Sequence, residues 1–74
     1  MKIKRKPIVL DGVQWNGDMS QLPAGCEILD AAVIVKTLEG NMIVSPGDWI
    51  ITGVKGERWP VKPDIFNMTY EKLP

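Results

Sequence analysis

The stretch that decides the fold is residues 31–52, which read AAVIVKTLEGNMIVSPGDWIIT. Three apolar runs within it, 31–37, 42–44 and 49–52, are rich in the β-branched and aromatic residues that favour strands. Gly40 and Asn41 adopt positive φ at low cost, so they predict a short loop that pairs the first two runs as a hairpin. Ser-Pro-Gly-Asp at 45–48 has the proline and glycine positions of a type II turn.

The flanking sequence extends the same pattern. We expect further strands over residues 8–15, 27–29 and 57–62, and a hairpin turn at Gly53–Gly56. Gly12 indicates a bulge or bend in the first of these strands. Pro60 cannot donate to a strand ladder, which confines the last strand to a sheet edge or a bulge.

A short helix is expected after the last strand. Pro63 suits the first helical position and Asp64 the first turn, and Phe66 and Tyr70 then lie four residues apart on one helical face. Residues 70–73 are expected to be extended. The chain is therefore predicted to be one domain over residues 1–74, mainly β (α+β): a small antiparallel sheet or open barrel of about five strands with one short C-terminal helix.

Charge divides the chain into two parts. Nine basic and nine acidic side chains give a net charge of zero over 74 residues. Residues 1–6, however, carry four cations and no acid, so residues 7–74 hold five bases and nine acids, a balance of minus four. The sequence predicts a basic N-terminal arm, residues 1–6, on an acidic body.

The composition argues against an enzyme. Histidine is absent, so the commonest general base and an imidazole metal ligand are both missing. The single cysteine, Cys26, forms neither an internal disulfide nor a zinc site by itself. Asp48 and Asp64 lie beside turns, where aspartate usually bonds its own backbone. We expect no catalytic residue, no cofactor and no metal.

Nothing in the sequence predicts contact with a membrane. The longest run without a charged or turn residue is about five residues, far below the length of a membrane span. The apolar residues that follow the basic start are too few for a signal peptide. We expect a soluble intracellular protein.

The three tryptophans are candidates for the core or for an interface. Trp49, between apolar neighbours, is expected in the core. Trp15 and Trp59 fit either role. Trp59 stands between Arg58 and Pro60 on a predicted edge strand, and a tryptophan beside an arginine is typical of an interface anchor.

The basic arm has three interpretations. It is a solvated, mobile terminus, a nucleic-acid contact, or a contact for an acidic protein surface. Four phosphate contacts give a salt slope of only about −3.6, and the acidic body would repel a duplex, so an acidic protein is favoured over nucleic acid. A weak single-stranded nucleic-acid binder and a small structural or accessory protein stay as alternatives. The candidate protein-binding residues are Lys2, Lys4, Arg5, Lys6, Arg58 and Trp59.

Several short motifs resemble a family of small proteins encoded in phage and prophage genomes. They are Thr-Leu-Glu-Gly at 37–40, Pro-Gly-Asp-Trp-Ile at 46–50 and Lys-Pro-Asp-x-Phe at 62–66, with matching residues at 6–9 and 14–15. Family members often have an aromatic residue where Arg58 stands and a cysteine where Val61 stands. The Arg58–Trp59 pair is therefore interpreted as a specialisation of this chain.

Within this family the chain is also similar to small phage-encoded transcription antitermination proteins that bind host RNA polymerase. The resemblance implies a non-enzymatic regulator in the host bacterial cytoplasm, monomeric when free, that docks on an acidic surface of a large polymerase subunit. It implies no direct contact with nucleic acid beyond nearby RNA, and effects on both termination and initiation.

Overall fold

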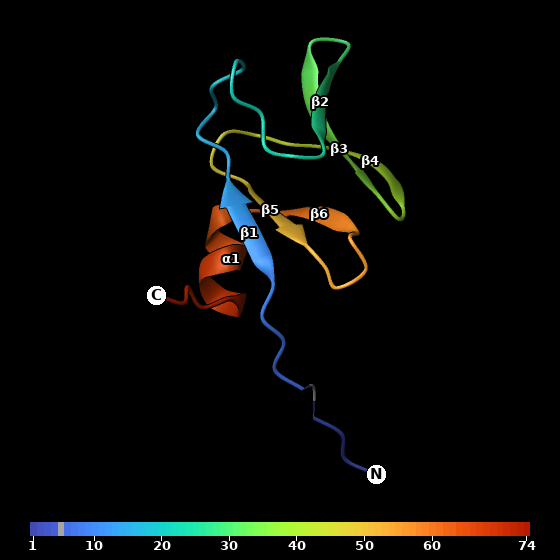
Figure 1. Cartoon of the computed structure of the whole chain (residues 1–74), viewed down its shortest axis with the longest axis vertical. Coiled ribbons are helices and arrows are strands. Elements are labelled where there is room, and N and C mark those ends of the chain that lie inside the picture. The colour runs from blue at the N-terminus through green and yellow to red at the C-terminus, as the bar shows by residue number, and fades with distance from the viewer. Residues whose placement is uncertain (5) are drawn as a thin grey trace.

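Two antiparallel sheets and one helix make up the fold (Figure 1). The computed structural model describes residues 1–4 and 6–74, and over these residues it has six strands in two three-stranded sheets, with one C-terminal helix. The elements are β1 (Asp11–Gln14), β2 (Cys26–Leu29), β3 (Ala32–Thr37), β4 (Gly40–Ile43), β5 (Trp49–Thr52), β6 (Arg58–Val61) and α1 (Pro63–Thr69). The mainly β prediction with a short C-terminal helix is confirmed, and the strands form two open sheets.

Sheet B, in the order β2-β3-β4, is built from two consecutive hairpins. The β2–β3 turn consists of Asp30 and Ala31, which have φ values of 51° and 63°. The β3–β4 connection is shorter than the predicted loop, because Thr37 and Gly40 already pair as strand residues. The Thr37 hydroxyl also donates a hydrogen bond to the Gly40 carbonyl oxygen at 2.7 Å. Gly40 has the expected positive φ, 108°, whereas Asn41 lies within β4.

Sheet A, in the order β1-β5-β6, joins the first strand to the last two. The prediction that the first strand starts at residue 8 is wrong, since β1 starts at Asp11, the partner of Thr52. The next residue after Thr52 is Gly53, where the chain turns into β6 and the ladder ends. Gly12 pairs regularly with Ile51, so the predicted bulge is absent from β1 as described.

The turn at residues 45–48 connects the two sheets. Its type II geometry is confirmed, since Gly47 has φ of 92° and the Asp48 N–H donates to the Ser45 carbonyl oxygen at 3.0 Å. The turn redirects the chain from β4 of sheet B into β5 of sheet A, so that the inner faces of the two sheets meet.

The core lies between the two sheets. It consists of Trp15, Val33, Val35, Val44 and Ile50, with Leu22 and Cys26 packed against it. Trp15, which fitted either role, is a core residue at 4 % exposed, and its indole N–H donates to the Asp18 carbonyl oxygen at 3.0 Å.

The helix covers the other face of sheet A. Phe66 is buried and stacks on Trp49 with ring centroids 3.9 Å apart, and on Tyr70 at 5.2 Å. Trp49 is therefore half-buried beneath α1 and does not join the core between the sheets, which corrects the expectation. Tyr70 has extended backbone angles, so the helix ends at Thr69.

Pro60 has the predicted edge position. The Gly53 N–H donates to the Glu57 carbonyl oxygen at 2.7 Å, so the backbone of Glu57 faces β5. Backbone groups alternate in direction along an antiparallel strand, so every second residue after Glu57 also bonds to β5. Pro60 is one of the residues between them, and its backbone nitrogen points away from β5. Because β6 is the last strand of sheet A, no strand lies on that side, and the absence of an N–H on Pro60 removes no hydrogen bond from the sheet.

Candidate functional site

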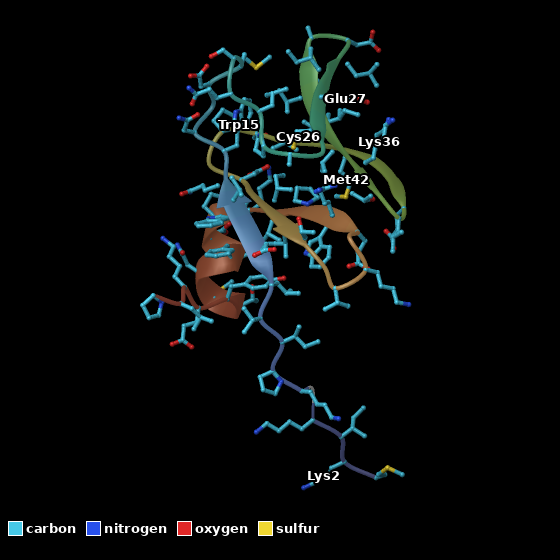
Figure 2. All side chains as sticks on the ribbon, viewed as in Figure 1. Lys2, Trp15, Cys26, Glu27, Lys36 and Met42 are labelled. Atoms are coloured by element: carbon cyan, nitrogen blue, oxygen red, sulfur yellow. The ribbon has the colours of Figure 1, made fainter. Side chains whose placement is uncertain are left out.

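The basic arm extends away from both sheets. Lys2, Lys4 and Lys6 are exposed, and Arg5 lies outside the described residues. Figure 2 places Lys2 at the tip of this extended segment, far from Glu27 and Lys36 of sheet B. Within the described part of the chain the ion pairs are Lys36–Glu27 and Lys62–Asp48, and neither involves the arm. Lys2, Lys4 and Lys6 are therefore accessible to a partner.

The Arg58 side chain packs between the sheets. A Cβ atom placed on Gly25 would lie 2.5 Å from Cδ and 2.9 Å from Nε of Arg58. This Nε is buried and has no hydrogen-bond partner among the described residues. Arg58 thus fills the space beside the start of β2 and is only partly accessible.

Cys26 follows Gly25 at this contact with Arg58. Burial raises the pKa of the Cys26 thiol, and the nearby Arg58 charge offsets part of that rise. The thiol is therefore protonated at neutral pH and is a poor nucleophile.

Trp59 lies on the opposite face of β6. Successive residues of a strand point to opposite faces, and Trp59 pairs across from Ile51, on the side of sheet A that α1 covers. It is half-buried and approaches Gly53, on which a Cβ atom would lie 3.0 Å from the indole Cζ3. Arg58 and Trp59 therefore do not present one joint surface, and β6 separates the two side chains.

A groove that the sequence did not indicate lies beside the arm. It runs between residues 6–12 and the helix with the C-terminal segment, and its wall includes Trp49, Phe66 and Tyr70. Lys72 lies over the Trp49 ring, with Nζ 5.2 Å from the centroid. The spacing of Phe66 and Tyr70 indicates that they share a face, but no local pattern indicates that Trp49 and residues 6–12 line the same groove.

Asp48 is a structural residue in the connecting turn. Its side chain is 2 % exposed, and Oδ2 accepts hydrogen bonds from the Ser45 N–H at 2.9 Å and from Lys62 Nζ at 3.1 Å. Asp64 is exposed in the first turn of α1. The two carboxylates thus occupy different environments, and Asp48 is engaged in fixing the turn.

Over residues 1–4 and 6–74, no group of three or more potential metal-ligating side chains comes together. Helix α1 has seven residues, and among the described residues no helix is long and apolar enough to cross a membrane.

The chain was compared with protein-family models, with curated proteins and with solved structures. None of the three comparisons gives a match.

Proposed function

We propose that this chain is a phage-encoded, non-enzymatic regulator that binds host RNA polymerase and modulates transcription. The observation that carries the proposal is the basic arm, whose lysines are exposed and whose tip, at Lys2, lies away from a body with a charge of minus four. Such a separation of charge orients the molecule toward an acidic protein surface and steers its encounter. The resemblance of the motifs at 37–40, 46–50 and 62–66 to small phage proteins supplies the identity of the partner.

The proposed mechanism is electrostatic and steric. The arm pairs with acidic residues of a large polymerase subunit, while the acidic body stays on the outside of the complex. A body docked beside the emerging RNA hinders formation of a terminator hairpin, and one docked where initiation factors bind hinders initiation. Trp59, half-buried on the helix side of sheet A, adds an apolar contact at the edge of the docked body.

A pull-down from host lysate tests the proposal. The tagged chain should enrich RNA polymerase at low salt and lose it as salt rises, because exposed charge pairs are screened over about 10 Å at 0.1 M salt. Absence of every polymerase subunit from the low-salt eluate would overturn the proposal.

Charge reversal in the arm gives the finer test. Replacing Lys4, Arg5 and Lys6 together by glutamate should weaken polymerase binding about tenfold or more, at about 0.5–1 kcal/mol for each exposed contact. A pair of single variants supplies the control. Lys4→Glu changes the charge of the arm, and Lys55→Glu makes the same change of charge in the β5–β6 turn. Equal weakening by the two single variants would show that only net charge matters and that the arm does not make the contact.

A further inference from the structure

β1 has a free edge. It is the outer strand of sheet A and, among the residues that the structure describes, bonds only to β5; all four of its residues are exposed. Unpaired N–H and C=O groups along such an edge accept a further strand from another chain. The residues before it, 6–10, continue in the direction of the arm without a strand partner among the described residues.

The register shows which backbone groups face outward. The Trp15 N–H donates to the Asp48 carbonyl oxygen at 2.9 Å, so Trp15 faces β5. Because N–H and C=O groups alternate in direction along an antiparallel strand, Val13 faces β5 as well, whereas Gly12 and Gln14 face away from it. The backbone of Gly12 and Gln14 is thus free to bond a strand laid against β1.

Grooves follow this strand along its length. The larger one is lined by residues 6–12 on one side and by apolar and aromatic residues of α1 and the C-terminal segment on the other, including Ile65, Phe66, Tyr70 and Leu73. A second, smaller hollow is lined by residues 13–16 and 21–23. A strand paired with β1 would therefore have apolar surface to cover with every second side chain.

Charge distinguishes the arm end of this edge from the free edges of sheet B. Inside the groove charges of both signs balance, since Lys6 and Lys72 line it together with Asp11 and Glu71. Beyond the groove the lysines at 2 and 4 continue along the arm, so the excess of positive charge lies at the arm end alone. The outer strand β2 instead carries Glu27, which pairs with Lys36 at 3.7 Å, and β4 contains no charged residue. A strand whose acidic residues lie at the end that meets the arm is therefore complementary to this edge.

We propose that β1 binds an extended segment of its protein partner by strand addition. Apolar side chains of that segment lie in the groove against Phe66 and Tyr70, and acidic side chains at one of its ends meet Lys2, Lys4 and Lys6. The inference rests on the proposed function for the identity of the partner, and it adds the mode of docking and the chemistry of the docked segment: an extended, alternating apolar strand with an acidic end.

Synthetic peptides and amide exchange provide the test. One peptide has alternating valine and threonine followed by a block of glutamates, and a second has the reverse order, so that parallel and antiparallel addition are both sampled. Binding of either peptide should slow hydrogen exchange at the amides of Gly12 and Gln14, which face outward. Failure of both peptides to bind, or binding that leaves these two amides unprotected, would overturn the proposal.

Gly12 offers a matched pair of variants. Gly12→Pro removes the outward N–H, while Gly12→Ala keeps it and adds a similar contact with Ile51, whose Cδ1 lies 3.2 Å from the position of a Cβ atom. Loss of one hydrogen bond predicts that the proline variant binds the peptide about twofold to tenfold more weakly than the alanine variant. Equal affinity of the two folded variants would contradict strand addition at this position.

The peptide assay separates this inference from the proposed function. Polymerase capture without peptide-induced protection of Gly12 and Gln14 would keep the partner and overturn strand addition. Protection by the peptide without polymerase capture would keep strand addition and overturn the identity of the partner.

Discussion

At the residue scale, the β2–β3 turn contains a strained alanine. Asp30 and Ala31 both have positive φ, as a two-residue hairpin turn requires, but an alanine Cβ is disfavoured there. Ala31→Gly should therefore raise the free energy of unfolding by about 0.5–1 kcal/mol, measured by urea unfolding. Ala32→Gly, one residue further into β3, is the control and should lower it by a similar amount. A lower stability for Ala31→Gly would contradict the turn geometry.

The Cys26 thiol predicts a pH dependence of stability. Burial raises its folded-state pKa, with the Arg58 charge offsetting part of the rise. The folded protein therefore holds the thiol proton to higher pH than the unfolded chain, whose thiol pKa is about 8.5. The resulting stabilisation is complete below about pH 8.5 and is lost as pH rises through the folded-state pKa.

Unfolding of wild type and Cys26→Ser under reducing conditions measures this contribution. From about pH 7 to about pH 10, wild type should lose more stability than the serine variant, because only the wild type carries the titrating thiol. Parallel stability curves for the two proteins would show that the thiol is not shifted by burial.

At the scale of elements, α1 depends on the Phe66 contact. A helix of seven residues is not stable alone, so stacking of Phe66 on Trp49 and Tyr70 holds it on sheet A. Phe66→Ala should cost about 3–5 kcal/mol and remove the ring-current shift of the Trp49 indole in NMR spectra. Phe66→Leu keeps most of the apolar volume and should cost less, so it gives a folded comparison.

Met68 is the control for that prediction. It lies on the same helix but is 74 % exposed, so Met68→Ala should change stability by no more than about 0.5 kcal/mol. Equal losses from the Phe66 and Met68 variants would contradict the assigned helix face.

Local sequence predicts the helix, the turns and the strands better than it predicts which strands pair and in which register. The Ser-Pro-Gly-Asp turn, the edge position of Pro60 and the helix from Pro63 follow from φ preferences and missing donors, which are properties of single residues. The start of β1 depends on where β5 ends, and that pairing joins residues about 40 positions apart. Local periodicity does not contain such a register and therefore predicts a strand at residues 8–10, which lie outside β1 in the structure.

The candidate site shows the same limit. The charges of the arm are visible in composition, because they cluster within residues 1–6. Arg58 and Trp59 are neighbours in sequence, yet strand alternation sends one between the sheets and the other toward α1. The free edge of β1 and its groove required the order β1-β5-β6, which no local pattern specifies.

At the scale of the whole molecule, both sheets share one small core. Val33 and Val35 from sheet B belong to one buried cluster with Ile50 from sheet A and Trp15, which follows β1. A 74-residue chain buries only about 60 % of the surface that its unfolded form exposes. The Phe66–Trp49 contact on the other face of sheet A is therefore expected to be too small to hold that sheet folded without the shared core. The two sheets should therefore unfold together.

Val35→Ala tests this coupling, because Val35 is fully buried at the shared core. Loss of two methyl groups and the resulting cavity should cost about 2–3 kcal/mol. Native-state hydrogen exchange should then accelerate by the same factor at protected amides of β3 and of β5, since both exchange through global unfolding. Faster exchange in β3 with unchanged exchange in β5 would mean that sheet A, with α1, is stable without sheet B.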